Sequence, residues 1–165
     1  MSKLKPFVAK TPYEATHPHV LAVYCSDGRF TEAVEELAHH LGHDRIDTLT
    51  LPGGPGLLNR WSADYMESDM VTRAASFLIR GHDILEVLLL AHAGCGYYQH
   101  RHGALGAEFI AEQQLKDLDA AAEELGKAFP GITVHKYFVR PMGPKIVFEP
   151  LDSSIHLSPD MIEEP

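Results

Sequence analysis

The stretch Ile84-Leu-Glu-Val-Leu-Leu-Leu-Ala91 is the most apolar segment of the chain, and it runs directly into His92-Ala-Gly-Cys95-Gly96. A short, nearly continuous apolar run is typical of a strand that is covered on both faces, as in a parallel sheet. His19-Val-Leu-Ala-Val-Tyr-Cys25 is a second run of this kind, and it ends in Cys25-Ser-Asp27-Gly-Arg29. The sequence therefore predicts two buried parallel strands, each followed at its carboxyl end by residues that can carry chemistry.

Strand-like and helix-like spacings of apolar residues alternate from about residue 19 to residue 149, which indicates an α/β fold. Further strands are expected at residues 46–51, 132–139 and 145–149. The turn at residues 141–144 is too short for a helical crossover, so the last strand is expected to be antiparallel. We expect an open, mostly parallel sheet of four strands in the order 2-1-3-4, an antiparallel fifth edge strand, and helices on both faces.

Helices are expected at residues 31–41, from about residue 64 to residue 81, and at residues 105–129. In the second helix, the residues predicted to face the core are Met66, Met70, Ala74, Phe77 and Leu78. In the third helix, the predicted inward residues are Phe109, Leu115, Leu118, Ala122 and Leu125.

The length of 165 residues and the hydrophobic content of 45% suit one globular domain, expected at residues 19–150. Residues 1–18 have no core pattern and are expected to be a loose tail or an arm laid on a partner subunit, and residues 151–165 to be a similar tail. The formal charge of −9 would repel phosphate backbones, so no nucleic-acid partner is expected. No apolar run is as long as the roughly 18 residues of a membrane span, so we expect no membrane association and a cytoplasmic location.

The chain has two cysteines, and both fall in the segments that follow the two most apolar strands. Two thiolates and one imidazole are ligands that zinc takes tetrahedrally, and three protein ligands leave a fourth position for water. In a sheet of order 2-1-3-4 the strands that end at Cys25 and at His92 are neighbours at the point where the strand order reverses, which is where such sheets bind ligands. The sequence therefore predicts a catalytic zinc (Zn²⁺) site formed by Cys25, His92 and Cys95.

At Cys25-Ser-Asp27-Gly-Arg29 and His92-Ala-Gly-Cys95-Gly96 the chain resembles the β-class carbonic anhydrases, and with its alternating architecture the resemblance covers roughly residues 19 to 149. The resemblance implies Cys25, His92 and Cys95 as zinc ligands and Asp27 with Arg29 as a catalytic dyad beside the metal. It implies reversible hydration of carbon dioxide to bicarbonate by a metal-bound hydroxide, and a homodimer or higher homo-oligomer. It also implies a closed state in which Asp27 is the fourth zinc ligand.

The chain departs from the family pattern after the second strand. Where the family usually has Arg-Asn-Ala-Gly, this sequence has Leu51-Pro52-Gly53-Gly54, which keeps the last glycine and loses both polar side chains. Gly53 and Gly54 still allow a close approach of the backbone to the metal. Because relatives hydrolyse carbonyl sulfide or carbon disulfide on a similar zinc centre, those sulfur analogues stay open as substrates.

Other interpretations of the same residues stay open. Cys25 can be a nucleophile of a thiol enzyme with Arg29 binding an oxyanion, although this leaves His92 and Cys95 without a role. The site can also be a non-catalytic zinc module of a sensor or scaffold. The residues can also have structural roles only. The cysteines are then small buried hydrophobic residues and His92 is a hydrogen-bonded loop histidine, while Asp27 caps a helix and Arg29 forms a surface ion pair with it.

Four further histidines stand near these motifs or at helical spacing. His100 and His102 follow the metal motif and are expected to be either solvated loop residues or carriers of the proton of a zinc-bound water. His39 and His43 are four residues apart on an expected helix, but no Glu completes a His-Glu-x-x-His zinc motif, so both are expected at the surface.

Overall fold

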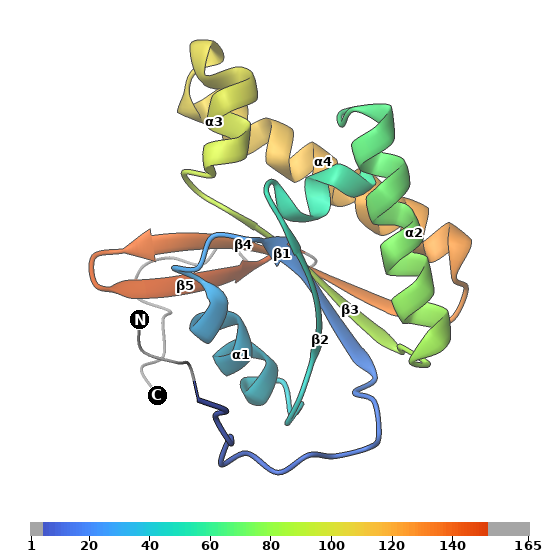
Figure 1. The fold of residues 1–165 in the computed structure, drawn as a ribbon. Coiled ribbons are helices and arrows are strands. Elements are labelled where there is room, and N and C mark those ends of the chain that lie inside the picture. The colour runs from blue at the N-terminus through green and yellow to red at the C-terminus, as the bar shows by residue number, and fades with distance from the viewer. Residues whose placement is uncertain (1–4, 152–165) are drawn as a thin grey trace.

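The computed structural model describes residues 5–151 (Figure 1). The strands are β1 (Val20–Cys25), β2 (Asp47–Leu51), β3 (Glu86–His92), β4 (Thr133–Met142) and β5 (Lys145–Pro150). The α-helices are α1 (Thr31–His40), α2 (Tyr65–Gly81), α3 (Gly96–His102) and α4 (Ala107–Ala128). Two short 3₁₀ helices are η1 (Gly54–Leu58) and η2 (Gly103–Leu105).

The five strands form one sheet in the order β2-β1-β3-β4-β5. The first four are parallel, and β5 is antiparallel to β4 through a tight turn, with Met142 opposite Lys145. Every residue of β1 is buried, as expected of a strand covered on both faces. The predicted fold class, strand order and antiparallel edge are therefore confirmed.

Helices cover both faces of the sheet (Figure 1). On one face α1 packs Val34 and Leu37 against alternate residues of β1 and β3, including Ala22 and Leu88. On the other face α2 and α4 enclose the larger core. Its fully buried side chains include Leu21, Val23, Val71, Val87, Leu89 and Leu118. Because β1 and β3 supply both cores, their carboxyl ends are held in place from both sides.

The helices differ from the sequence prediction in the faces that they bury. In α2 the predicted inward residues Met66, Met70 and Phe77 are exposed, whereas Ala74 and Leu78 are partly buried. The residues of α2 that face the core are Ser68, Val71, Ala75 and Ile79. In α4 the predicted inward residue Phe109 is 37% exposed, while Leu118 and Leu125 are buried as predicted and Leu115 and Ala122 are partly buried. Small residues fit the close approach of α2 to the sheet, so size and not hydrophobicity alone selects its inner face.

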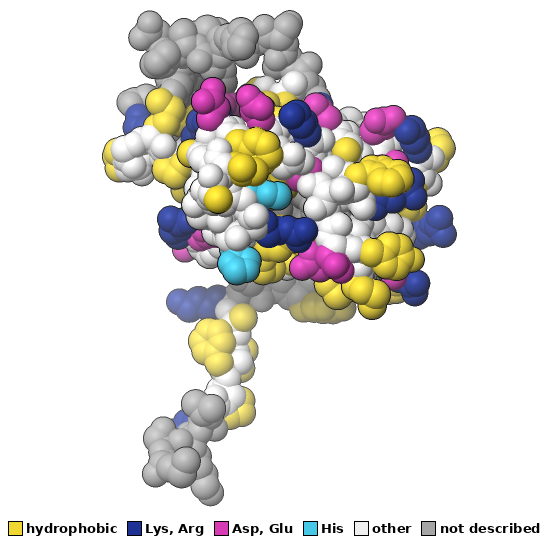
Figure 2. All heavy atoms as spheres, turned by 90° about the horizontal axis from the view of Figure 1, so that it is seen from above, with side chains coloured by type: hydrophobic (Ala, Val, Ile, Leu, Met, Phe, Trp, Pro, Cys, Tyr) yellow, Lys and Arg dark blue, Asp and Glu magenta, His cyan; other side chains and the backbone are white. Residues whose placement is uncertain are grey.

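The segment before β1 contains no helix or strand over residues 5–18, and most of its side chains are exposed (Figure 2). The end of this segment nearest β1 contacts the folded domain. Arg45 forms an ion pair with Glu14 at 3.0 Å, and the His17 ring stacks on the His82 ring with 3.8 Å between the ring centroids. The predicted tail at residues 151–165 lies outside the described residues except for Leu151. Among the helices at residues 5–151, none is long and apolar enough to cross a bilayer.

Candidate metal centre

The sheet topology brings the two sequence motifs together. Cys25 is the last residue of β1 and His92 is the last residue of β3, and these strands pair in parallel register with Tyr24 opposite Leu90. Cys95 follows three residues after His92, at the N-cap of α3. The three side chains therefore meet at the carboxyl edge of the sheet, on either side of the reversal in strand order.

The ligand atoms of Cys25, His92 and Cys95 all lie within 4.8 Å of one another, and the three residues are buried. The two sulfur atoms are 3.8 Å apart. Two sulfurs bound to a tetrahedral zinc at about 2.3 Å each are also separated by about 3.8 Å. The spacing of the donors therefore fits a zinc ion without rearrangement of the cysteines.

The imidazole of His92 is oriented for metal binding. Its Nδ1 lies 3.0 Å from the Ala93 carbonyl oxygen, which fixes the proton on Nδ1. The other nitrogen, Nε2, is buried and has no hydrogen-bond partner among the residues described. A buried polar atom without a partner is costly, and a metal ion at this position would satisfy it.

The two cysteine side chains influence each other through the contact between their sulfur atoms. The contact with the Cys95 sulfur lowers the pKa of Cys25 to about 4 against the opposing effect of burial. The same contact, together with burial, raises the pKa of Cys95. Burial works to lower the pKa of His92, but the adjacent Cys25 thiolate and the Ala93 carbonyl raise it overall. The surroundings of Cys25 thus favour its thiolate, the form that binds metal.

Backbone amides stabilise negative charge on both sulfurs. The N–H groups of Gly53 and Asp27 hydrogen-bond the Cys25 sulfur, and those of Tyr97 and Tyr98 hydrogen-bond the Cys95 sulfur. These donors come from the loop after β2, the loop after β1 and the first turn of α3. The three loops therefore supply both the ligands and the polar surroundings that a metal thiolate site needs.

Asp27 and Arg29 form a hydrogen-bonded ion pair beside the cysteines. The Arg29 Nε lies 2.9 Å from Oδ1 of Asp27 and its Nη2 lies 2.5 Å from Oδ2, while the Arg29 backbone N–H also donates to Oδ1. These bonds from Arg29 lower the pKa of Asp27 to about 2. Asp27 does not belong to the group of ligand atoms within 4.8 Å, because its carboxylate is turned onto Arg29.

The loop Leu51-Pro52-Gly53-Gly54, which departs from the family pattern, packs directly on the metal loops. Gly53 and Gly54 have φ values of +87° and +55°. A Cβ at Gly54 would lie 2.7 Å from the backbone nitrogen of Cys25, and one at Gly53 would lie 2.6 Å from the Tyr97 ring. The expected close approach of a glycine backbone to the site is present, and the loop continues into η1 instead of ending as an irregular turn.

A buried polar network from α4 supports the metal loops, and sequence analysis missed it. The Asp117 carboxylate, 1% exposed, accepts hydrogen bonds from Tyr98 at 2.6 Å and from Asn59 at 2.9 Å. Ser62 and Gln113 also donate to it. In the same helix the buried Gln114 amide donates to the His92 carbonyl oxygen at 3.0 Å. The sequence signal that points to this network is the pair Gln114 and Asp117 on the otherwise apolar inner face of α4.

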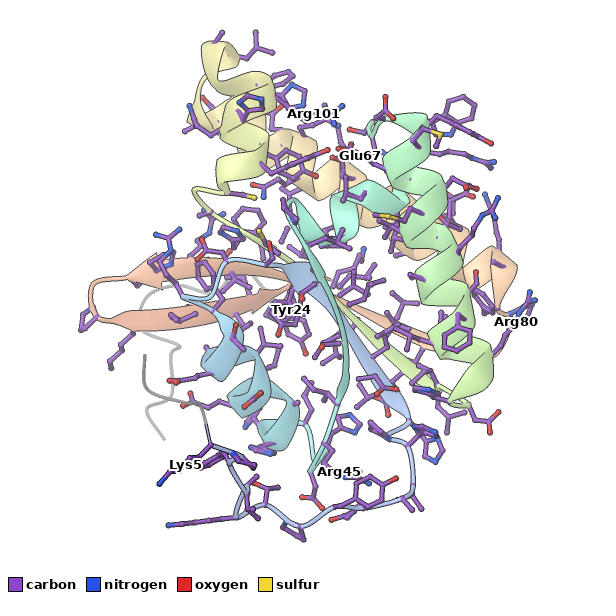
Figure 3. All side chains as sticks on the ribbon, in the orientation of Figure 1. Lys5, Tyr24, Arg45, Glu67, Arg80 and Arg101 are labelled. Carbon is purple, nitrogen blue, oxygen red and sulfur yellow. The ribbon has the colours of Figure 1, made fainter. Side chains whose placement is uncertain are left out.

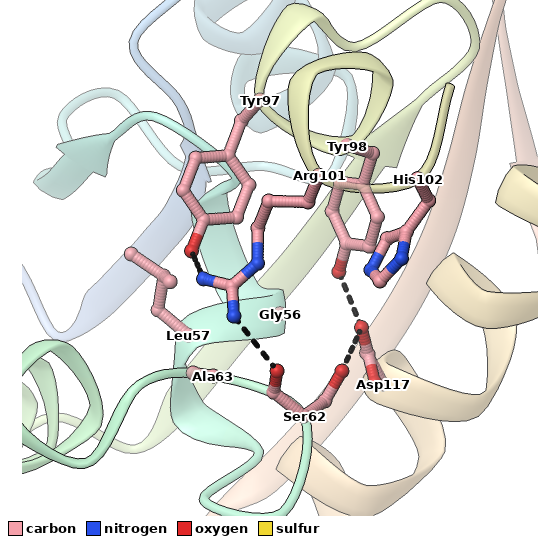
Figure 4. Close-up of a pocket in the computed structure, with 9 residues that line it drawn as sticks. All are labelled: Gly56, Leu57, Ser62, Ala63, Tyr97, Tyr98, Arg101, His102 and Asp117. Atoms are coloured by element: carbon pink, nitrogen blue, oxygen red, sulfur yellow. Dashed lines mark hydrogen bonds between the residues drawn. The ribbon is translucent and has the colours of Figure 1, made fainter. Parts of the chain in front are cut away.

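A small pocket lies beside this network, lined by Tyr97, Tyr98, Arg101, Ser62 and Asp117 among others (Figure 4). Arg101 contacts the Tyr97 hydroxyl and pairs with Glu67 at 3.0 Å, which places it against the N-terminal part of α2 (Figure 3). Burial raises the pKa of Tyr97 to about 12, so its hydroxyl stays protonated and can donate to Glu67. None of the three candidate ligands lines this pocket, so it is separate from the metal centre.

The four further histidines considered in the sequence, His39, His43, His100 and His102, lie outside the group of candidate metal-ligand atoms. His100 and His102 lie on α3, which replaces the expected loop, and the His102 ring lies 6.3 Å from the Tyr98 ring. His39 is exposed on α1, whereas His43 follows the end of that helix and lies 3.4 Å from Glu86. The expectation that His43 shares a helix face with His39 is therefore wrong, because α1 ends at His40.

No protein-family model and no curated protein matches the sequence. Solved structures do match the fold. The β-carbonic anhydrase isoform I of the protozoan Trichomonas vaginalis is 14% identical, with 86% of this chain and 87% of that chain covered and a TM-score of 0.55. Tetrameric β-carbonic anhydrases of the ascomycete Sordaria macrospora are represented at 15% identity, 81% coverage of both chains and a TM-score of 0.51. A carbonic anhydrase from Glaciozyma antarctica is also 15% identical, with 81% and 82% covered and a TM-score of 0.51.

At these identities the likeness concerns the fold, and it is independent of the two short motifs from which the family resemblance was drawn. The sheet order, the antiparallel edge and the meeting of β1 and β3 at the candidate metal centre are observed in this chain itself. The chain thus has the fold of the β-class carbonic anhydrases, the family that its Cys25 and His92 motifs resemble.

Proposed function

We propose that the protein is a zinc-dependent carbonic anhydrase that interconverts carbon dioxide and bicarbonate, with the metal held by Cys25, His92 and Cys95. The observation that carries the proposal is the buried His92 Nε2, which has no hydrogen-bond partner among the described residues. It lies within 4.8 Å of the sulfur atoms of Cys25 and Cys95, which are 3.8 Å apart. When bound at such a site, zinc lowers the pKa of a water molecule to about 7 and so makes hydroxide available at neutral pH.

Asp27 and Arg29 have separate roles in this proposal. Asp27, whose pKa is held at about 2, stays ionised at all working pH values and can accept a proton in a hydrogen bond from the nucleophile. Arg29 holds both carboxylate oxygens, which fixes the orientation of Asp27 and keeps it from turning to the metal. A closed state with Asp27 as a fourth ligand would require the Arg29 contacts to break first.

Carbonyl sulfide or carbon disulfide is the second candidate substrate. The observation that favours it is the loop after β2, where Leu51 and Pro52 stand in place of polar residues and Gly53 packs on the Tyr97 ring. This loop offers no side-chain hydrogen-bond donor to an oxygen of the substrate, so it discriminates little between carbon dioxide and its less polar sulfur analogues.

The test combines metal analysis with stopped-flow hydration of carbon dioxide for the wild type, Cys95→Ser and Asp27→Asn. We expect one zinc per chain in the wild type, loss of zinc in Cys95→Ser, and retained zinc with slowed turnover in Asp27→Asn. Full zinc occupancy with no hydration at any pH would refute carbonic anhydrase activity, and sulfide release from carbonyl sulfide by the same preparation would then support the second candidate. No turnover of either substrate would favour the sensor or scaffold role.

We also propose that residues 19–150 form the catalytic domain and that the protein acts as a homodimer or higher homo-oligomer in the cytoplasm. The solved relatives from Sordaria macrospora are tetrameric, which supports self-association of this chain. Two free thiols 3.8 Å apart favour a reducing compartment, because oxidation to a disulfide would remove both metal ligands.

A further inference from the structure

A second cluster of metal-ligating side chains lies at the opposite edge of the sheet from Cys25 and His92. Glu86 is the first residue of β3, and His135 is the third residue of β4. His43 follows the end of α1. Since Glu86 and His92 are the two ends of one strand of 7 residues, the two clusters are about 20 Å apart.

The pairing of β3 with β4 and the packing of α1 bring these three residues to one face of the sheet. Leu88 is opposite His135 in the parallel register, and Leu88 belongs to the core that α1 covers. Side chains two residues apart on a strand point to the same face, so Glu86 shares the face of Leu88. The backbone N–H of His43 donates to the Ala38 carbonyl oxygen at 2.9 Å, which joins His43 to α1. The cluster therefore lies where the loop after α1 meets the first residues of β3 and β4.

The carboxylate of Glu86 lies between two imidazole rings. Its Oε2 atom is 3.4 Å from Nε2 of His43 and 3.4 Å from Nε2 of His135. These distances are longer than those of a well-formed N–H···O hydrogen bond. Two ligand atoms bound to a tetrahedral zinc at about 2.0–2.1 Å each are separated by about 3.3–3.4 Å, so both contacts match the spacing of zinc ligands.

The Nε2 atom of His43 is in the same situation as that of His92. Each is buried without a hydrogen-bond partner, and within the part of the chain that the structure describes no other side-chain nitrogen or oxygen atom has this property. A buried polar atom without a partner is costly. A cation bound beside Glu86 would satisfy Nε2 of His43 in the way that a metal at the first centre would satisfy His92.

We propose that His43, Glu86 and His135 form a second binding site for zinc. Two imidazoles and one glutamate are one of the ligand sets that hold this ion in proteins, with a water in the fourth position. The three ligand atoms do not all lie within 4.8 Å of one another, as those of the first centre do, so one ring moves inward when the ion binds. The His135 side chain is 39% exposed against 21% for His43, and it therefore has the greater freedom to move.

The second site should bind zinc more weakly than the first centre, because it must be drawn together and contains no thiolate. It should therefore be filled only when zinc is supplied in excess, and the protein should keep the ion of the first centre alone once the excess is removed. A bound ion would connect the loop after α1 to β3 and β4, which are otherwise joined there only by packing and by the contacts of Glu86.

The test counts the zinc ions bound by the full chain in equilibrium dialysis against excess zinc. The wild type should bind two ions per chain, whereas Cys95→Ser should bind only the weaker one. In His135→Gln and in Glu86→Gln the affinity for the weaker ion should fall at least about 100-fold, since loss of an outer-shell partner alone costs about 10–100-fold. His135→Gln is expected to fold normally because the side chain is at the surface, and thermal unfolding of the metal-free variant checks this.

His40→Gln is the matched control. His40 is an exposed histidine at the end of α1, three residues before His43, and it is not one of the three residues of the cluster. This variant should bind two ions like the wild type. If it weakens binding of the second ion as much as His135→Gln does, the ion is held by scattered surface histidines and the proposal is wrong.

The results for the two zinc sites are distinguishable, because the sites share no residue. A wild type that binds one ion, kept in His135→Gln and lost in Cys95→Ser, would refute the second site and leave the proposed function intact. One ion that is kept in Cys95→Ser and lost in His135→Gln would support the second site and count against the zinc centre of the proposed function.

Discussion

Replacing Gly54 by alanine tests whether close packing of a glycine on the backbone of β1 positions the Cys25 ligand. Gly54 has a φ of +55°, a conformation that costs a residue with a Cβ about 1–2 kcal/mol. The new Cβ would lie 2.7 Å from the Cys25 nitrogen and 2.8 Å from the Tyr24 carbonyl carbon. Both are backbone atoms of a buried strand that cannot move aside, so overpacking adds about 1–3 kcal/mol.

The two effects together predict that Gly54→Ala lowers the free energy of unfolding by about 2–5 kcal/mol. For a chain of this size, each kcal/mol shifts the Tm by about 2–4 °C, so the Tm should fall by roughly 5–15 °C. Thermal unfolding of the metal-free protein measures this directly. Zinc titration should also show weakened binding, because any relaxation of the clash displaces Cys25.

Gly28→Ala and Gly126→Ala are the matched controls. Gly28 lies beside the metal loop and Gly126 lies within α4, and neither would bring a Cβ within 4 Å of another atom or has a positive φ. Gly28→Ala should leave the Tm nearly unchanged, and Gly126→Ala should raise stability by up to about 1 kcal/mol because alanine favours helix. A Gly54→Ala protein with wild-type Tm and zinc affinity would refute the packing argument.

Further predictions concern the groups around the ligands. Gln114→Met leaves the buried His92 carbonyl without its donor, so unfolding free energy should fall by about 1–3 kcal/mol and the absorption spectrum of the cobalt-substituted protein should shift. Asp117→Asn places an amide N–H group against the Tyr98 and Asn59 donors that the carboxylate accepts, so denaturant unfolding should show a similar loss. Asp119→Asn, which weakens only the exposed carboxylate's ion pair with Lys136, should cost less than about 1 kcal/mol. The ion pair of Asp27, whose pKa falls from 3.8 to about 2 on folding, stabilises the metal-free protein above about pH 4 and ceases to do so as pH falls through about 2. The stability difference between wild type and Arg29→Ala should therefore be constant at neutral pH and vanish toward pH 2, and a difference that grows on acidification would contradict the assignment.

The strands and the ligand cluster could be predicted because their signals are local. Continuous apolar runs indicate buried parallel strands, and a cysteine or histidine at the end of such a run must lie at the carboxyl edge of the sheet. Cys25 and His92 needed only β1 and β3 to be neighbours, and the order 2-1-3-4 that makes them so is one of the common orders of alternating strands and helices. The position of Cys95 then follows from its three-residue distance to His92.

The inner faces of the helices could not be predicted in the same way. Helix α2 has apolar residues on two sides, and periodicity cannot tell which side faces the sheet when the true inner face contains Ser68 and Ala75. The burial of Asp117 depends on Asn59, which lies 58 residues earlier and has no local relation to α4. Partners that meet only after folding leave little trace in the pattern of a single segment.

Each candidate metal ligand is held by a different part of the chain, which predicts that the geometry of the centre is fixed before a metal binds. Gly54 packs on Cys25, Gln114 holds the His92 carbonyl, and Asp117 anchors Tyr98, whose N–H contacts the Cys95 sulfur. A change at any of these supports loosens both the fold and one ligand, so loss of stability and loss of zinc affinity should rise together across Gly54→Ala, Gln114→Met and Asp117→Asn. Cys95→Ser removes a ligand while leaving the supports intact, and it should abolish zinc binding at nearly wild-type stability of the metal-free protein. If Cys95→Ser instead loses stability in the same proportion to its loss of zinc affinity as the three support variants do, zinc affinity reports only on how much of the protein is folded. The idea of a preformed centre is then wrong.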